Sequence, residues 1–194
     1  MSATTNNTNP KAQNVLRIRE LWGRQIREAS QKYNISPALL GAFGSKESLN
    51  GDKYSTRFEA HYKTAIIRTN KARPSDILPG SHSHGACQIM GVHAKAFAYL
   101  GTLKTEQGYN LIHCGTLDLT IDDLYNIPFD CCCKVLKYNC EPYLSKKDYA
   151  NVGSIYNGGV PSSNIPSVKQ YVKELLEYIT LYEISYKNVS IDQD

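Results

Sequence analysis

The sequence lacks any long apolar run. No stretch approaches the ~18 apolar residues that a membrane-spanning helix needs, so we expect no membrane insertion. The N-terminus also lacks a basic segment followed by an apolar one, so no secretory signal peptide is predicted. An excess of one charge is nearly absent as well, because 22 basic and 18 acidic residues leave a net charge of +4. That charge is too small to indicate a specific nucleic-acid partner.

The chain has 194 residues and is too short for two full-sized domains. Its mean hydropathy of -0.42 is typical of a soluble protein. The first residues are rich in Asn and Thr and carry few apolar side chains. We therefore predict a disordered tail over residues 1–13, a single domain over residues 14–187 and a C-terminal tail over residues 188–194, and we expect a monomer.

Apolar residues recur at intervals of three and four over much of the chain, which predicts a mainly α fold. Ser36 followed by Pro37 is typical of a helix start, and the Gly158-Gly159 pair is typical of a helix end. Residues 52–91 contain proline and glycine without a sustained period, so we expect loops with short helical or extended pieces there. The predicted helices cover residues 15–33, 37–50, 93–100, 128–143, 146–157 and 167–186.

Aromatic residues are unevenly distributed, with one Trp, four Phe and 14 Tyr. Tyrosine combines an aromatic face with a hydroxyl group, which suits a polar ring-shaped ligand, although tyrosines also fill half-exposed core positions. Six cysteines are present, and three of them, Cys131 to Cys133, are consecutive. Consecutive cysteines in one helix cannot all form disulfides without strain, so we interpret most of the six as small buried apolar residues.

Glu47 stands out among the acidic residues. It follows Phe43 by four residues and Leu40 by seven, so on a helix it shares their apolar face. A carboxylate in such a place loses hydration, which raises its pKa toward the range that a general acid needs. The alternative is that the helix frays near Ser45 and that Glu47 is a solvated end residue.

Two glycine-containing motifs follow in the chain. In GACQIMG, residues 85–91, the glycines allow a ligand to approach the backbone, and Gln88 offers a donor and an acceptor to sugar hydroxyl or acetamido groups. In IYNGG, residues 155–159, the hydroxyl group of Tyr156 lies at a helix end. Taken alone, the second motif is an ordinary helix cap.

Taken together, the motifs are more specific. The order Glu47-Ser48, GACQIMG, IYNGG and a closing helix with QYVKELL resembles that of soluble lytic transglycosylases and goose-type lysozymes, over roughly Ile35 to Ile179. KES followed by FEAHY more narrowly resembles the phage N-acetylmuramidase endolysins, which carry a Phe-Glu-x-His element there. The resemblance implies a lysozyme-like α-helical domain in which a loop-rich or short β segment lines a glycan cleft.

The resemblance also implies roles for individual residues. Glu47 would protonate the glycosidic oxygen between N-acetylmuramic acid and N-acetylglucosamine, and Tyr156 would form a hydrogen bond near this acid. The chain departs from the family pattern at Cys87, Gly91 and Gly158, although endolysins also have glycine after the Met. The implied substrate-binding residues are Ser48, His61, Gln88, Met90, Tyr156 and Asn157.

A second carboxylate decides the mechanism. Hydrolysis with inversion needs a base ~6.5–9.5 Å from the acid, whereas in a lytic transglycosylase the 6-hydroxyl group of the sugar attacks and one acid suffices. Asp52, Glu59 and Asp76 are candidates, and we choose Glu59 because it lies in the FEAHY element, which could also be a helix packed on the core. We therefore expect hydrolysis that yields reducing ends, with transglycosylation as the alternative.

Other classes of function remain open. His82, His84 and Cys87, with His93 beyond them, have the spacing of a metal site, but no CxxC or HExxH completes the set, so we expect no metal and no cofactor. Cys87 with His61 or His113 is a conceivable nucleophile pair. A third alternative is a non-catalytic glycan-binding or structural component of a phage or secretion apparatus.

The partner that these patterns favour is the peptidoglycan glycan strand. Five basic residues near the expected cleft fit an anionic wall polymer, although they also fit a solvated helix face. Because no signal peptide is predicted, we expect synthesis in the cytoplasm and action on the bacterial wall after release by a holin or a machine. The five residues are Arg57, Lys63, Arg68, Lys71 and Arg73.

Overall fold

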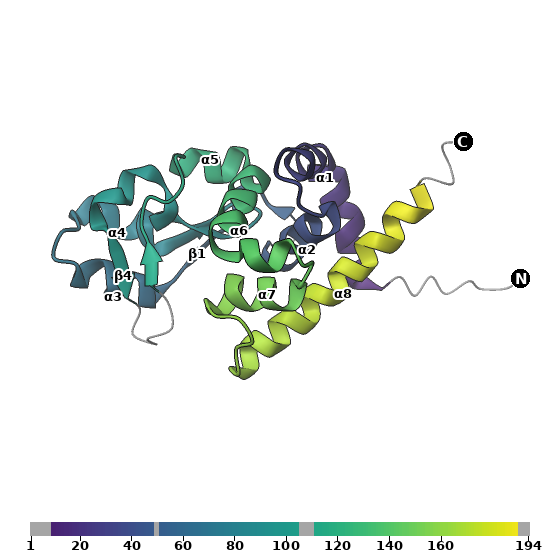
Figure 1. Cartoon of the computed structure of the whole chain (residues 1–194). Coiled ribbons are helices and arrows are strands. Elements are labelled where there is room, and N and C mark those ends of the chain that lie inside the picture. The colour runs from purple at the N-terminus through teal and green to yellow at the C-terminus, as the bar shows by residue number, and fades with distance from the viewer. Residues whose placement is uncertain (1–8, 49–50, 105–110, 190–194) are drawn as a thin grey trace, which may run out of the picture.

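Two lobes of unequal size make up the computed structural model, which describes residues 9–48, 51–104 and 111–189 (Figure 1). The large lobe consists of helices α1 Pro10–Tyr33, α2 Pro37–Glu47, α5 Ile121–Asn126, α6 Pro128–Leu144, α7 Tyr149–Gly158 and α8 Pro166–Val189. The small lobe consists of β1 Thr56–Phe58, α3 Ala60–Arg68, α4 Pro74–Ser81, β2 His82–His84, β3 Ile89–Met90, the 3₁₀ helices Gly91–His93 and Lys95–Leu100, β4 Thr102–Lys104 and β5 Leu111–His113.

Helix α2 is the central element of the large lobe. It packs against α1, α6 and α8, and the eight residues from Ala38 to Ser45 are all buried. Two glycines permit this close packing, since a Cβ on Gly41 would lie 2.3 Å from the ring of Tyr182 and a Cβ on Gly44 would lie 2.9 Å from Phe129. The helix is therefore apolar on every side, and its C-terminal end emerges at the junction of the lobes.

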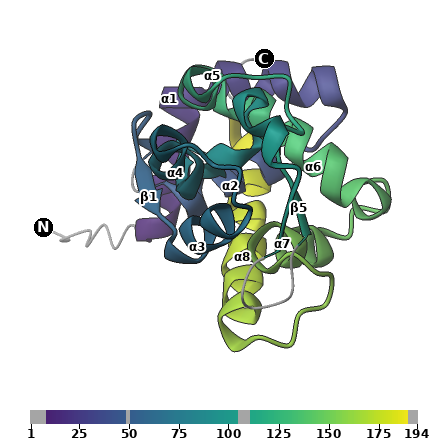
Figure 2. The same ribbon diagram turned by 90° about the vertical axis from the view of Figure 1, so that its left-hand side faces the viewer.

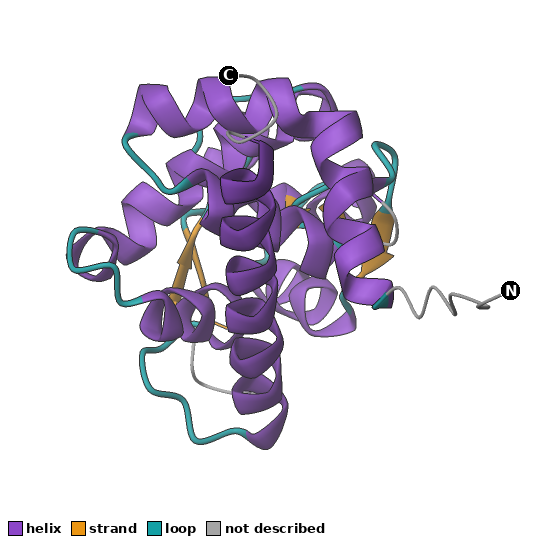
Figure 3. Ribbon diagram, turned by 90° about the vertical axis from the view of Figure 1, so that its right-hand side faces the viewer, coloured by secondary structure: helices purple, strands orange, loops and turns teal. Residues whose placement is uncertain are grey.

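The small lobe is built on short antiparallel strands. Strand β2 pairs with β1 and β3, in a register that places Arg57 opposite Ser83, and β4 pairs with β5 to form a separate hairpin. Helices α3 and α4 cover this part and enclose a core around Ile66, Phe97 and Leu103. Figure 3 shows that the short strands lie in separate places in a molecule made mainly of helices.

The predicted mainly helical fold is confirmed. Ser36 caps α2 with Pro37 in the first turn, and α6 begins at Pro128 as predicted. Gly159 ends α7 in the left-handed conformation, and Thr120 caps α5 together with Asp123, three residues later. None of the helices in the described residues is both long and apolar enough to cross a membrane.

Several boundaries differ from the prediction. Helix α1 begins at Pro10, inside the predicted tail, because the side chain of Asn9 accepts a hydrogen bond from the Lys11 N–H and proline fits the first turn. Helix α8 extends to Val189, beyond the predicted limit of the domain. The predicted helix over residues 93–100 is two 3₁₀ segments, because Ala94 between them has an extended backbone with ψ of 147°. Residues 1–8 and 190–194 of the predicted tails lie outside the described residues.

The six cysteines are all buried free thiols, as the prediction for most of them stated. Consecutive side chains on α6 point to different neighbours: the Cys131 thiol contacts the carbonyl oxygen of Asp123, and the Cys133 thiol contacts that of Ala29 on α1. Cys132 faces Cys87 and Tyr156. Three small side chains in a row therefore let α6 pack closely on three sides.

Candidate active site

A cavity of about 460 Å³ lies between the two lobes, and we call it the cleft. Figure 2 shows the small lobe in front of α2, α7 and α8, the elements that supply the opposite wall. Sequence segments more than 100 residues apart meet here, since β1 and α8 both contribute. The cleft is lined by Glu47, Arg57, Glu59, His61, Tyr62, Ser83, Gln88, Met90, Tyr156, Asn157, Gly158, Ile165, Ser167 and Val168.

Glu47 is the last residue of α2, so the most buried helix of the molecule presents a carboxyl group to the cleft. The hydroxyl group of Tyr171 on α8 donates a hydrogen bond to Glu47 Oε1. Burial raises the pKa of Glu47, while the Tyr171 hydrogen bond and the positive charges of Arg57 and Lys46 act in the opposite direction. The net effect favours a protonated Glu47 at a higher pH than an ordinary glutamate.

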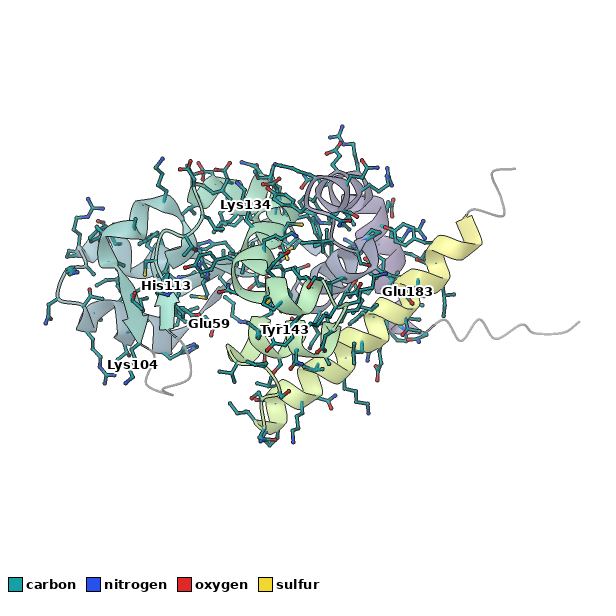
Figure 4. The ribbon with its side chains drawn as sticks, in the orientation of Figure 1. Glu59, Lys104, His113, Lys134, Tyr143 and Glu183 are labelled. Atoms are coloured by element: carbon teal, nitrogen blue, oxygen red, sulfur yellow. The ribbon has the colours of Figure 1, made fainter. Side chains whose placement is uncertain are left out.

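Glu59 reaches the same cleft from the small lobe. It is the N-cap residue of α3, and its backbone N–H donates to the Ser81 carbonyl oxygen at 2.9 Å. Its side chain, 18% exposed, accepts a hydrogen bond from Arg57 Nε at 2.6 Å and lies 3.9 Å from Nδ1 of His61. Figure 4 shows Glu59 on the side of the small lobe that faces α7. Arg57 and Glu59 therefore form an ion pair in the lining of the cleft.

Lys46 and Glu174 form an ion pair next to Tyr171, the residue that bonds to Glu47. Lys46 Nζ lies 2.6 Å from Glu174 Oε2 and 5.2 Å from the centre of the Tyr171 ring, so the cation covers the ring that donates to Glu47. This arrangement fixes the side chain of Tyr171 and links α2 to α8 beside the cleft. Helical spacing does not predict this pair, because it does not show which two helices are neighbours.

The GACQIMG segment forms the floor of the cleft. Gln88 has a left-handed backbone with φ of 48°, and its amide is fully used inside the protein. It accepts from Ser83 Oγ at 2.8 Å and donates to the carbonyl oxygens of Ser55 at 3.1 Å and Gly85 at 2.9 Å. The observed role of Gln88 is therefore to hold the loop, whereas contact of its amide with a sugar stays a prediction.

The two glycines of this segment do not have the expected role of admitting a ligand. A Cβ on Gly85 would lie 2.0 Å from the carbonyl oxygen of Leu124, and a Cβ on Gly91 would lie 2.0 Å from that of Pro79. Both glycines therefore let the protein's own backbone segments approach each other. The motif was recognisable in the sequence, but the neighbour that requires the glycines became visible only in the fold.

Tyr156 lines the cleft together with Glu47, and its hydroxyl group is bonded to the backbone. Its hydroxyl group donates to the Cys87 carbonyl oxygen at 2.6 Å, and its ring lies 4.4 Å from that of Phe43. The tyrosine that contacts Glu47 is instead Tyr171. The sequence pattern placed Tyr171 on the inner face of the closing helix, but gave no sign that this face meets the end of α2.

The remaining predicted substrate-binding residues divide into two groups. His61, Met90 and Asn157 line the cleft. Ser48 does not line it, because its hydroxyl group donates to the Gly44 carbonyl oxygen at 2.8 Å and ends α2. Ser48 instead lines an adjoining cavity of about 640 Å³, which shares Glu47 with the cleft.

The other two carboxylates considered as a base lie outside the lining of the cleft. Asp52 accepts from the Tyr54 N–H at 2.9 Å, and Asp76 forms an ion pair with Arg73 at 2.7 Å. Of the five basic residues expected near the cleft, Arg57 alone lines it. The positive charge in the cleft therefore serves chiefly to pair with Glu59.

The histidines of the H-x-H-x-x-C pattern are engaged elsewhere. His84 uses Nδ1 with the Tyr125 hydroxyl at 2.6 Å and Nε2 with the Pro79 carbonyl oxygen at 2.9 Å. Within residues 9–48, 51–104 and 111–189, no group of three His, Cys, Asp or Glu side chains converges as metal ligands do. Burial raises the pKa of the Cys87 thiol, which opposes the thiolate that a nucleophile requires.

Comparison with known proteins places the chain in no family. No family model matches it, and neither the curated proteins nor the solved structures contain a match. The chemistry of the cleft is therefore argued from this chain's own residues. Those residues are a dehydrated carboxyl group, Glu47, and a carboxylate paired with a guanidinium, Glu59, which face one solvent-filled space.

Proposed function

We propose that the protein is a muramidase that hydrolyses the β-1,4 bond between N-acetylmuramic acid and N-acetylglucosamine in peptidoglycan. The observation that carries the proposal is the pair of carboxyl groups with opposite environments in one cleft. Burial raises the pKa of Glu47, whereas Glu59 forms an ion pair with the guanidinium of Arg57. A glycosidase needs this combination, because one group must donate a proton while the other accepts one.

Each carboxyl group has a defined step. Glu47 transfers its proton to the glycosidic oxygen as the bond from this oxygen to C1 of the muramic acid breaks. A water molecule then attacks C1, and Glu59 accepts the proton that this water loses. Arg57 orients the carboxyl group of Glu59 through their hydrogen bond, and Tyr171 orients that of Glu47. The product carries a reducing end with inverted configuration.

The shape of the site supports a polymeric substrate. The cleft adjoins the cavity beside α1 and a third one near β5, since Gln88 is in the lining of all three. Glu47 lies where the first two meet, so a strand can extend to both sides of the acid. A large helical lobe and a small β-containing lobe on either side of this cleft also support the lysozyme-like architecture that the motifs imply.

The decisive experiment compares wild type with Glu47→Gln on purified peptidoglycan. The variant keeps the size of the side chain and an oxygen that accepts from Tyr171, but it has no proton to donate. We expect the rate of cleavage to fall by about 10²–10⁴-fold. Mass spectrometry of the wild-type digest should show reducing ends, and Glu141→Gln, at an exposed position on α6, should cleave at the wild-type rate.

Folding of the variant is a separate readout. A carboxyl group with a raised pKa contributes unfavourably to stability once pH exceeds its unfolded-state pKa of ~4.3, so Glu47→Gln should unfold at the wild-type temperature or above it at pH 7. Wild-type lysis by Glu47→Gln would contradict the role of the acid. Products lighter by one water, with 1,6-anhydro ends, would contradict hydrolysis and indicate a lytic transglycosylase.

A further inference from the structure

A second cavity of about 140 Å³ opens off the cleft, and we call it the side recess. It lies between β5 of the small lobe and helices α6 and α7 of the large lobe. Tyr62, Gln88, Met90 and Tyr156 line both spaces, so the two are continuous. Neither proposed catalytic carboxylate lines the side recess, and the mechanism above makes no use of it.

The walls of the side recess combine apolar and polar groups. Ile112 from β5, Val135 from α6 and Ile155 from α7 present aliphatic side chains. Asn139, exposed on α6, adds an amide that offers both a donor and an acceptor. A small group with a methyl and an amide would satisfy both kinds of wall.

His93 provides a polar group whose state is well defined. Its Nδ1 lies 3.0 Å from the Thr116 hydroxyl, which fixes the ring. Burial lowers the pKa of His93 to about 4, so the imidazole is neutral near pH 7. Its other nitrogen, Nε2, forms no hydrogen bond with any residue that the structure describes. A neutral ring with a vacant nitrogen suits an uncharged amide better than a carboxylate.

Residues from both lobes form the outer edge of the side recess. The ring of Tyr138 on α6 stands edge-on to that of His113 on β5, with centroids 6.2 Å apart and planes at 72°. Both rings line the recess. Because Tyr138 is 56% exposed, a bound group can reach the ring from the solvent side.

Size limits what the side recess can hold. A cavity of ~150 Å³ accommodates a molecule of the size of benzene, with about six heavy atoms. The side recess, at about 140 Å³, is therefore too small for a complete N-acetylated sugar. It can hold a branch of such a sugar while the ring itself stays in the cleft.

From this geometry we propose that the side recess binds a methyl-bearing amide that branches from a glycan strand lying in the cleft. The proposal rests on the proposed function, because it takes the strand to be peptidoglycan. Two branches of that polymer have this chemistry: the acetamido group of either sugar, and the lactyl-linked peptide of muramic acid. The methyl packs against Ile112, Val135 and Ile155, and the amide bonds to His93 and Asn139.

The test blocks the side recess from its exposed edge with Asn139→Trp. Glu141→Trp is the matched control, because it places the same side chain on the same helix outside the recess. Three substrates are compared: intact peptidoglycan, strands from which an amidase has removed the peptides, and the same strands after de-N-acetylation. Circular dichroism melting of both variants establishes that each is folded.

We expect Asn139→Trp to lower kcat/KM at least about tenfold on the substrate that carries the bound branch and less than about twofold on the substrate that lacks it. A loss confined to intact peptidoglycan identifies the peptide, and a loss that persists until de-N-acetylation identifies the acetamido group. An equal loss on all three substrates, or none on any, overturns the proposal.

A binding measurement separates this proposal from the catalytic one. Saturation-transfer NMR on Glu47→Gln protein uses N-acetylmuramoyl dipeptide and di-N-acetylchitobiose, which carry the two kinds of amide. The methyl signals of these ligands should persist in the double variant Glu47→Gln/Glu141→Trp. They should disappear in the double variant Glu47→Gln/Asn139→Trp. Recess-dependent binding without any hydrolysis by the wild type would refute only the muramidase. Hydrolysis by the wild type, together with ligand binding that Asn139→Trp leaves unchanged, would refute only the proposed role of the side recess.

Discussion

The two lobes handle a carboxyl group in opposite ways. The core cluster of the large lobe has 30 buried residues in the described chain, and that of the small lobe has nine. Glu47 ends a helix inside the larger core, where dehydration determines its protonation. Glu59 begins a short helix of the smaller lobe, where it forms an ion pair with Arg57. The comparison teaches that a helix end inside the larger core dehydrates its carboxyl group, whereas the smaller lobe provides its carboxylate with a charged partner.

Glu59→Gln tests the small-lobe side with the largest expected effect. Loss of the proton acceptor should lower the rate of peptidoglycan cleavage by about 10²–10⁴-fold. The free energy of unfolding should change by ~1 kcal/mol or less, because Arg57 is 60% exposed and the lost pair is partly solvated. Asp76→Asn removes a carboxylate that also pairs with an arginine in the small lobe, but outside the cleft, and should leave the rate unchanged. Equal losses in the two variants would contradict a specific role for Glu59.

Leu40→Ala and Leu103→Ala compare the two cores directly. Both leucines are at most 1% exposed, so either truncation should cost about 2–5 kcal/mol within its own lobe. Leu40→Ala should lower the protection of amides throughout the molecule, because α2 contacts α1, α6 and α8. Leu103→Ala should lower protection mainly in the small lobe. Native-state hydrogen exchange measures both, and equal losses in both lobes after Leu103→Ala would show a single cooperative core.

Tyr171→Phe sharpens the account of the acid. The Tyr171 hydrogen bond lowers the pKa of Glu47, so its removal raises that pKa further. A general acid must be protonated, and activity falls as pH rises through its pKa; the alkaline limb of the kcat/KM profile should therefore move to higher pH. Tyr182→Phe, on the same helix and bonded to Ser45 instead, should leave the limb in place. A limb that moves to lower pH in Tyr171→Phe would refute this electrostatic assignment.

The smallest expected effect concerns the thiols. All six are buried, and burial raises the pKa of Cys114 and Cys131 to about 12, so the native protein should react slowly with a disulfide reagent at pH 8. Cys114 belongs to the smaller core and should react first, through local opening of that lobe. Mass spectrometry after timed labelling gives the order. Fast labelling of Cys87 would revive the nucleophile alternative.

The sequence predicted helices well where local signals coincide with burial. Ser36 with Pro37 and Thr120 with Asp123 satisfy backbone groups within a few residues, so their patterns are complete in the sequence. The strands were anticipated only as extended pieces, because β1 to β3 are three residues long or shorter and β1 pairs with β2 across more than 20 residues of chain. The break at Ala94 had no local signal.

The sequence predicted which residues line the site better than it predicted which of their atoms contact one another. Glu47, Glu59, His61, Met90 and Asn157 do share a cleft. The tyrosine that bonds to the acid lies 124 residues from Glu47, and one partner of the Gln88 amide, the Ser55 carbonyl oxygen, lies 33 residues away. The ion pair of Glu59 is local, because Arg57 is two residues away, but no helical or strand spacing predicts it. A motif records which residue types are present, but not which of their atoms are already satisfied by the fold.

What the sequence by itself determined is the helical character, the buried face that carries Glu47 and the order of motifs that suggests a glycan-cleaving site. The tertiary structure decided that Glu47 is dehydrated and that Glu59 faces the same cleft. The physical reason is range: helix periodicity and caps act over a few residues, whereas the desolvation of Glu47 and its hydrogen bond depend on what α8 and the small lobe bring to the end of α2. Those segments meet only when the two lobes fold around the cleft.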